Sequence, residues 1–534
     1  MADPFWHLPY PSQRQPVLAS SMVATSQPLA AQAGLEVMRG GGNAVDAAVT
    51  TAAAMAVLEP CNNGLGADNF ALVWHEGKLY GLNGSGRAPT AMGPNHLAGK
   101  KKVPELGWEP VTVPGAVSGW MALSKRFGRL PFGRLLEPAI HCAAEGFPVA
   151  PLTAAMWAGA VKRFKRYPDL GKTFLPGGNS PAAGEKFTNP DQARSLRMIA
   201  DTEGEAFYRG EIAQKIASHA KSTGGLLTAD DLSAHTADWV EPISVAYHGH
   251  RLYEIPPNGQ GLAALMALGI LSARDIRRLG PDCPDVLHLE IEAIKLAFAD
   301  AHKHIADPRF MDVKVEQLLS SGYLLQRAAL VDPDHAGEPK AGDPKPGGTI
   351  LVTTADAHGT MVALIQSNYL GFGSGIVVPG TGIHLQDRGA CFTLERGHPN
   401  CMAGGKRPYH TIIPAFLTRV ADGGREEPVM AFGVMGGFMQ PQGHLQVASR
   451  LIDFQQNPQA ALDAPRWQVT TGKHVLIEPG YEKSVYDDLR RRGHELDIAP
   501  TRTIKFGSGQ AIFRLKDCYL GASDPRHDGH AVGF

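Results

Sequence analysis

The chain has 534 residues, of which 43% are hydrophobic and 19% charged, as in soluble globular proteins. Its 51 basic and 52 acidic side chains leave a formal net charge of -1, so no overall field favours nucleic acid or an anionic membrane as partner. The N-terminus lacks the apolar core of a secretory signal, and the most apolar helical stretch, residues 44–58, is too short and too polar to cross a bilayer. We therefore expect a cytoplasmic protein that binds neither nucleic acid nor membrane.

The first third of the chain is predicted to be rich in helix. Ser26 and Pro28 open a helix whose apolar residues recur with helical spacing, and three consecutive glycines from Gly40 end it. Asn43 is suited to cap the next helix, because its side chain can accept from the first free amides. A glycine-rich loop then leads into a predicted strand at residues 70–74.

The second half changes from helix to strand at one point. Residues 288–304 give the clearest helical pattern, and residues 334–348 contain glycines, prolines and charges without apolar periodicity, as in an exposed linker. Strands are predicted at 349–355 and 360–367, with a turn between them. Shorter strands are expected around Ile383, Ile412 and Val429. The pattern indicates an α+β protein in which helices are layered on antiparallel sheet.

The junction of linker and strand, Gly347-Gly348-Thr349, carries possible chemistry. A threonine hydroxyl is a weak nucleophile that needs a base nearby, and cleavage before Thr349 would supply one as its own α-amine, with a pKa of roughly 7.7–8.0. Glycine at position 348 would minimise crowding during such a cut. A threonine that opens a strand after a glycine turn is also a common structural feature, so spacing alone leaves both interpretations open.

Ten segments carry a resemblance to a known family, in the same order along the chain. They are GGNAVDAAV at 41–49, GLGADNF at 64–70, GRAP at 86–89, VPGAVSGW at 113–120, IPPNGQG at 255–261, AIKLAFADA at 293–301, GGT at 347–349, SNYLGFGSGI at 367–376, GGFMQPQGH at 436–444 and GASDPRHDGH at 521–530. In these segments the chain resembles the γ-glutamyltransferase (glutathione hydrolase) family of N-terminal-nucleophile hydrolases. The resemblance implies a four-layer αββα sandwich. It also implies a precursor cut into a large subunit, residues 1–348, and a small subunit, residues 349–534, which remain together as a heterodimer.

The resemblance also implies roles in catalysis. Cleavage between Gly348 and Thr349 would make Thr349 the nucleophile and the first residue of the small subunit. Ser367, on the neighbouring strand, would orient the nucleophile or its amine. The backbone amides of Gly436 and Gly437 would form the oxyanion hole, where losing one donor typically costs about 2.7–4 kcal/mol.

The substrate-binding positions are a mixture of match and departure. Arg87 resembles the large-subunit arginine that grips a substrate carboxylate, as a planar guanidinium can do with two hydrogen bonds. Asp387 keeps one carboxylate where the family holds the α-amine of a γ-glutamyl group.

Other residues in this region differ from true γ-glutamyl enzymes. Arg388 and Cys391 stand where an acid or amide and a second acid are expected, and His410-Thr411 replace paired serines. Because Arg388 would repel an ammonium group, the pattern is closer to the family's cephalosporin acylase-like and amidohydrolase-like branch, whose acyl groups include glutaryl.

No other motif explains the chain as well. Close histidine pairs occur at 248/250, 302/304 and 527/530, but none has a metal-ligand pattern, and no GxSxG elbow is present. We therefore expect neither metal nor organic cofactor, and a small-molecule amide as substrate. Three functions remain open: an autoprocessing amidohydrolase and acyltransferase acting on γ-glutamyl amides through a threonyl ester, a glutaryl-type amidase with little γ-glutamyl activity, and a non-catalytic binding protein that keeps the fold.

Overall fold

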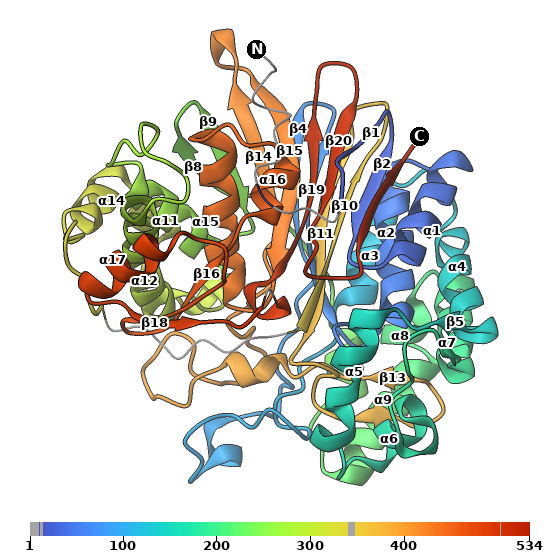
Figure 1. Cartoon of the computed structure of the whole chain (residues 1–534). Coiled ribbons are helices and arrows are strands. Elements are labelled where there is room, and N and C mark those ends of the chain that lie inside the picture. Colours follow the sequence, from blue (N-terminus) through green and yellow to red (C-terminus); the bar gives the residue numbers. More distant parts are fainter. Residues whose placement is uncertain (1–9, 11–13, 340–347, 502) are drawn as a thin grey trace.

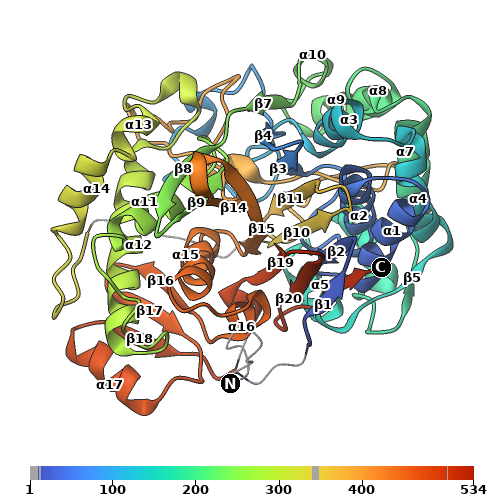
Figure 2. The same ribbon diagram turned by 90° about the horizontal axis from the view of Figure 1, so that it is seen from above.

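Two seven-stranded antiparallel sheets stack face to face, and helices cover the outer surface of each (Figures 1 and 2). The computed structural model describes residues 10, 14–339, 348–501 and 503–534, and the numbers of elements given below refer to these residues. The arrangement is the four-layer αββα sandwich that the sequence predicted.

The first sheet lies next to the helices formed largely by the C-terminal half. Its strands, in spatial order, are β1 (Val17–Ala19), β20 (Tyr519–Ser523), β19 (Ser508–Arg514), β15 (Glu426–Met435), β14 (Ala415–Val420), β9 (His250–Glu254) and β8 (Ile243–Tyr247). The helices that contact it are α11 (Gly261–Leu271), α15 (Met439–Ile452) and α16 (Pro458–Asp463), with α12 (Pro284–His304) packed on α11.

The second sheet lies next to helices from the N-terminal third. Its strands, in spatial order, are β21 (His530–Gly533), β2 (Met22–Thr25), β10 (Gly348–Ala355), β11 (Met361–Tyr369), β3 (Asp68–His75), β4 (Lys78–Asn83) and β7 (Asp238–Val240). The helices that contact it are α1 (Pro28–Arg39), α2 (Ala44–Leu58) and α3 (Ala116–Phe127), with α4 (Phe132–Glu145) packed on α2.

Smaller elements extend both halves. The helices on the side of the second sheet lie in the lower right of Figure 1 and are α5 (Pro151–Arg163), α6 (Pro168–Phe174), α7 (Pro190–Asp201), α8 (Glu205–Tyr208) and α9 (Glu211–Thr223). Two short strand pairs lie on the same side: β5 (Phe147–Pro148) with β6 (Lys186–Phe187), and β12 (Val377–Val378) with β13 (Ile383–His384). The helix α10 (Ala229–Ser233) packs on α8 and α9. On the other side lie α13 (Val315–Leu318), α14 (Ser321–Ala328), α17 (Lys483–Arg491) and the three-stranded sheet of β16 (Trp467–Thr471), β17 (His474–Ile477) and β18 (Glu495–Ile498).

Alternation along the strands builds the layers. In β10, Ile350 and Val352 pack with the α2 core, whereas Leu351 packs in the core between the two sheets, as the two-residue period of a strand requires. In β11, Ile365 also faces the inter-sheet core. Thr349 and Ser367 lie two residues from Leu351 and Ile365, at one end of this inter-sheet layer.

Several predicted boundaries are confirmed. Asn43 caps α2, accepting from the amides of Val45 and Asp46 while Asp46 caps the amide of Asn43 in return. The strand predicted at 70–74 is the centre of β3, and the two strands after the linker are β10 and β11. The helix predicted at 288–304 is the main part of α12.

Three predictions need correction. Pro28 opens α1 as predicted, but the residue that caps it is Gln27 and Ser26 lies outside the helix, because the Gln27 side chain accepts from the first amides while the Ser26 hydroxyl donates to Glu59. Ile412 lies before β14 rather than in a strand. The predicted linker ran to residue 348, but Gly348 is already the first residue of β10; residues 340–347 lie outside the described residues.

Candidate active site

Thr349 lies at an irregular point in the pairing of β10 with β11. Gly348 is opposite Tyr369 and Ile350 is opposite Gln366, so β11 has one residue more than β10 in this interval. The Thr349 side chain is buried, and its Oγ1 donates to Ser367 Oγ over 3.3 Å. Such a bulge redirects a side chain out of the regular pleat, and here it brings two hydroxyls together as the sequence predicted.

Ser367 connects the nucleophile candidate to the bond before it. Its Oγ donates to the carbonyl oxygen of Gly348 at 2.5 Å and accepts from the Tyr369 amide at 2.8 Å. A hydroxyl has only one proton to donate, so with that proton on Gly348 the Thr349 hydroxyl is the donor in the Thr349–Ser367 contact. The hydrogen bond from Ser367 polarises the Gly348 carbonyl, which is the group that a nucleophile would attack in a cleavage before Thr349.

Gly348 is in a crowded position. A Cβ added there would lie 2.7 Å from Asn62 Oδ1 and 3.2 Å from both the Cys61 carbonyl and the Gly371 amide. Glycine leaves the bond to Thr349 accessible where a larger residue would push against the loop at residues 59–63.

Gly436 and Gly437 lie between β15 and α15, with φ angles of 126° and 63° that favour glycine. In the described part of the chain, their carbonyls accept from Met439 and Gln440, but neither of their N–H groups donates to another backbone carbonyl. Two unengaged donors ahead of a helix N-terminus are suited to stabilise a developing negative charge.

Gln440 links this loop to Thr349, and sequence reasoning missed it. Its Nε2 donates to Thr349 Oγ1 at 3.5 Å, and its Oε1 accepts from the Ile413 amide at 2.9 Å. Gln260 supports the same loop by donating to the carbonyls of Gly437 and Thr411. Both glutamines are in the matched segments, but nothing in their local spacing indicates a contact across the sheets.

Arg388 is the charged group nearest to these hydroxyls in the hydrogen-bond network of the described residues. Its side chain is buried, with Nη2 donating to Ser367 Oγ at 3.3 Å and Nη1 to Thr411 Oγ1 at 2.7 Å. The guanidinium lies 4.7 Å from the centre of the Tyr369 ring, and Cys391 Sγ is 3.9 Å from Nη1. The structure therefore brings Arg388, Thr411 and Ser367 together.

Asp387 and His410 are buried beside this group. Asp387 Oδ1 accepts from the Leu370 amide at 3.0 Å, and burial raises the pKa of Asp387 to about 8. His410 donates from Nε2 to Asp68 Oδ2 at 3.2 Å, and burial, followed by repulsion from Arg388, lowers its pKa well below the usual value. Burial also raises the pKa of Asp68 to about 7, and this carboxyl was not predicted from the sequence.

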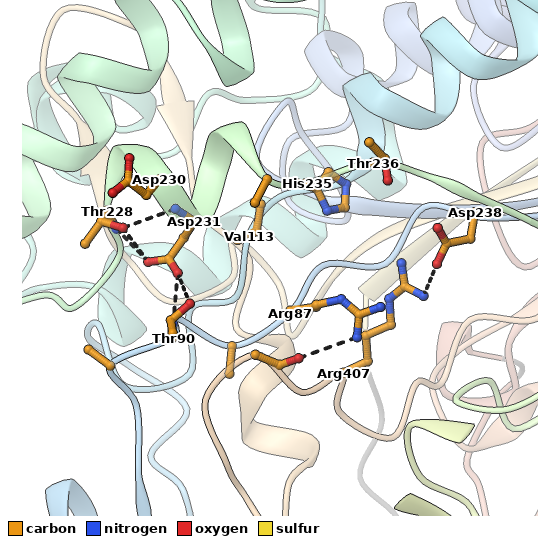
Figure 3. A pocket seen from close by; sticks show the side chains of 14 residues that line it. Arg87, Thr90, Val113, Thr228, Asp230, Asp231, His235, Thr236, Asp238 and Arg407 are labelled. Carbon is orange, nitrogen blue, oxygen red and sulfur yellow. Dashed lines mark hydrogen bonds and ion pairs between the residues drawn. The ribbon is translucent and has the colours of Figure 1, made fainter. Parts of the chain in front are cut away.

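Arg87 lies in a different setting. Its Nη1 is 2.9 Å from Asp307 Oδ2, and the side chain lines an open cavity of about 570 Å³ together with Arg407, which pairs with Asp238 (Figure 3). The lining of this cavity includes neither Thr349 nor the other hydroxyl-bearing residues of its network. The Arg87 carboxylate contact expected from the sequence is thus already made within the protein, to Asp307.

A polar cluster elsewhere has metal-ligand residue types. His288, Glu292 and His494 form the single such group among the described residues. However, the Lys295 ammonium lies 2.5 Å from Glu292 Oε1, and His288 Nδ1 is hydrogen-bonded to His494 Nε2 at 2.8 Å. Lys295 also donates to the Gly337 carbonyl, so we interpret the cluster as an anchor for the chain around Gly337. The expected absence of a metal and an organic cofactor stays a prediction.

A comparison with family models decides the family. The model described as Gamma-glutamyltranspeptidase matches residues 30–534. The chain belongs to this family. It is 35% identical to the glutathione hydrolase-like YwrD proenzyme of Bacillus subtilis, over 96% of this chain and 98% of that one, and 36% identical to the oxamate amidohydrolase proenzyme of Klebsiella pneumoniae, over 97% and 99%.

A solved structure extends the comparison. The cephalosporin acylase from Bacillus halodurans has a TM-score of 0.94 and 48% identity, covering 100% of this chain and 99% of that one. The chain is therefore a γ-glutamyltranspeptidase-family hydrolase with the N-terminal-nucleophile fold, and its similar proteins include amidohydrolases and acylases. None of its described helices combines the length and apolar character needed to cross a bilayer.

Proposed function

We propose that this hydrolase releases its own nucleophile by cleavage between Gly348 and Thr349, and then cleaves amides through a threonyl ester. The observation that carries the proposal is the shared position of Ser367 Oγ, 2.5 Å from the Gly348 carbonyl oxygen and 3.3 Å from Thr349 Oγ1. The names of the two curated relatives given above describe them as proenzymes, which supports processing here.

In the self-cleavage step, Thr349 Oγ1 attacks the Gly348 carbonyl carbon and the hydroxyl proton leaves toward Ser367. The carbon–nitrogen bond breaks, the Thr349 nitrogen takes a proton, and the acyl group of Gly348 is left as an ester on Oγ1. Water then hydrolyses this ester, giving a Gly348 carboxylate and a free Thr349 with an α-amine. Ser367 assists by polarising the attacked carbonyl.

In the catalytic cycle, the α-amine of Thr349 takes the proton from its own hydroxyl, which attacks the carbonyl of an amide substrate. The amides of Gly436 and Gly437 stabilise the oxyanion, and Gln440 holds the nucleophile against their loop. The leaving amine takes the proton from the α-amine and departs. Water, or an acceptor amine, then attacks the ester and restores Thr349.

Two substrate classes follow, and one observation favours the second. γ-Glutamyl amides would place an ammonium near Asp387, but the Arg388 cation lies within 3.3 Å of Ser367 and would repel it. Acyl groups that carry a carboxylate without an α-amine avoid this repulsion. Similarity to a cephalosporin acylase and to an oxamate amidohydrolase supports the same choice.

The first experiment is the intact mass of the purified protein in denaturant, with N-terminal sequencing of any smaller fragment. We expect fragments 1–348 and 349–534 from the wild-type chain and one uncut chain from Thr349→Ala. Thr353→Ala is the matched control, because Thr353 lies on the same strand and its hydroxyl has a single hydrogen bond among the described residues, to the Ala24 carbonyl. Normal cleavage of Thr349→Ala would overturn the proposal. A wild-type chain that stays uncut and inactive would favour a non-catalytic binding protein with this fold.

A further inference from the structure

Arg388 is a buried cation without a carboxylate partner. Its side chain has no exposed surface, and among the described residues no carboxylate oxygen lies within ion-pairing distance of its nitrogens. The groups that contact it are neutral: the hydroxyls of Ser367 and Thr411, the Cys391 thiol and the Tyr369 ring. Its Nε has no hydrogen-bond partner.

Such an arrangement is costly unless an anion completes it. Removing a guanidinium from water without an anionic partner is strongly unfavourable, and neutral hydroxyls recover only part of the lost hydration. The nearby acids Asp68 and Asp387 make no ion pair with Arg388 in the described part of the chain. Burial raises their pKa values to about 7 and about 8, so near neutral pH Asp387 is mostly protonated and Asp68 carries only part of its charge. Asp387 Oδ2 also lacks a partner, as suits a carboxyl group that keeps its proton.

Arg87 differs on each of these points. It is about one-third exposed and already has an anionic partner, Asp307, at 2.9 Å. Asp307 accepts from Arg309 as well, which fixes this carboxylate between two guanidinium groups. An incoming substrate carboxylate would gain less at Arg87 than at a cation with no anionic neighbour.

We propose that Arg388, and not Arg87, binds the free carboxylate of the acyl group, and that Arg388 is the residue that selects acyl groups without an ammonium. This inference rests on the proposed function of Thr349. It departs from the sequence-based expectation that Arg87 grips the substrate carboxylate. Arg87 instead lines a separate cavity together with Arg407.

The position of Ser367 limits the length of the acyl chain. Thr349 Oγ1 and Arg388 Nη2 both lie 3.3 Å from Ser367 Oγ, so they are at most about 7 Å apart. The carboxylate must hydrogen-bond to Arg388 while the amide carbonyl carbon lies roughly 3–3.5 Å from Oγ1. Extended glutaryl and succinyl groups match such a span, whereas an eight-carbon suberyl group has to fold back to make both contacts, so we expect the shorter groups to be turned over faster.

The test compares two chromogenic amides of equal chain length, glutaric acid mono-4-nitroanilide and valeric acid 4-nitroanilide. The quantity measured is the ratio of their kcat/KM values, which cancels any change in the fraction of folded enzyme. We expect Arg388→Met to lower this ratio on the order of 100-fold, because the carboxylate then enters a buried site without a partner. Arg388→Lys keeps the charge but not the two-pronged geometry and should give an intermediate ratio.

The outcomes separate this inference from the proposed function. Arg87→Met should leave the ratio within a few-fold of wild type, and a selective loss there with none in Arg388→Met would overturn the inference. Equal turnover of glutaric and suberic mono-4-nitroanilides would overturn the length limit. Calorimetry measures the binding of glutarate to wild type and to Arg388→Met without any turnover. Binding that is lost in Arg388→Met supports Arg388 as the carboxylate-binding residue even if the threonyl-ester mechanism fails. Glutarate binding equally well to both would refute it.

Discussion

At the scale of single residues, Ser367 has the contacts to act in self-cleavage as well as in catalysis. Its hydroxyl donates to the Gly348 carbonyl and accepts from Thr349 and Arg388. Ser367→Ala removes these contacts together with the hydrogen bond from the Tyr369 amide, and we expect self-cleavage to slow by at least about tenfold, equivalent to roughly 1.4 kcal/mol. The decline of the uncut chain with time, followed by intact mass after cell-free synthesis, measures the rate. Ser367→Thr, which keeps the hydroxyl, should cleave near the wild-type rate, whereas unaltered cleavage of Ser367→Ala would contradict the role.

Asp68 predicts how stability depends on pH. In the folded chain burial raises its pKa from 3.8 to about 7, so between these values the folded state holds a proton that the unfolded state has released. The unfolding free energy therefore falls as pH rises from about 4 to 7, and the loss is complete above 7. Asp68→Asn has no such proton, so its unfolding free energy does not fall in this way. The unfolding free energy of the variant minus that of the parent should therefore be higher at pH 8 than at pH 5 by on the order of 2 kcal/mol.

Urea unfolding at the two pH values measures this difference. The Thr349→Ala background is suitable for parent and variant, because we expect it to leave one uncut chain and a simple transition. The Asn side-chain oxygen can still accept the hydrogen bonds that the amides of Gly86 and Gly115 donate to Asp68 Oδ1, so the backbone contacts are preserved. A constant difference between parent and variant across this pH range would show that Asp68 titrates normally.

At the scale of elements, the start of β10 depends on glycine. An added Cβ at Gly348 would meet Asn62 Oδ1 at 2.7 Å, and Asn62 is itself held by Glu59. We expect Gly348→Ala to displace the Gly348 carbonyl from Ser367 and to slow self-cleavage several-fold or more. The time course of the uncut chain is again the measurement. Gly322→Ala in α14 is the control, since its Cβ would meet nothing within 4 Å, and equal rates for the two variants would refute the crowding argument.

Local sequence pattern was enough to predict single elements and the contacts within one hairpin. Asn43, the helix that became α12 and the hairpin of β10 and β11 follow from capping and periodicity, which act over a few residues. The pairing of Thr349 with Ser367 was predictable because a short hairpin fixes its own register.

Contacts across the fold could not be predicted in this way. Gln440 reaches Thr349 across 91 positions of sequence, and Asp68 reaches His410 across 342. Similarly, Arg87 could be identified as a candidate carboxylate binder from its motif, but its pairing with Asp307 depends on a loop 220 residues away. Sequence spacing does not tell which charged side chain is paired within the protein. The assignment of Arg388 depends on this information, because Arg87 is paired with Asp307 whereas Arg388 has no carboxylate partner among the described residues.

At the scale of the whole molecule, the proposed cleavage site lies inside a sheet rather than between domains. The segment after the cut supplies β10 and β11, which lie between β2 and β3 from the segment before it (Figure 2). In the other sheet, β14 pairs with β9 and β20 pairs with β1, so both sheets contain strands from both sides of position 348. The proposed cleavage would therefore make Thr349 a chain terminus without removing it from the sandwich.

This interleaving predicts that the cleaved protein behaves as one cooperative unit. Separating the fragments would break the β2–β10, β3–β11, β9–β14 and β1–β20 ladders and expose the core between the sheets. We expect fragments 1–348 and 349–534 to elute together in size-exclusion chromatography without denaturant, and to unfold in a single thermal transition monitored at both fragments by hydrogen exchange. The uncut Thr349→Ala chain is the control and should elute at the same volume. Fragments that separate under native conditions, or that melt at different temperatures, would mean that one chain segment folds without the strands of the other, which neither seven-stranded sheet allows.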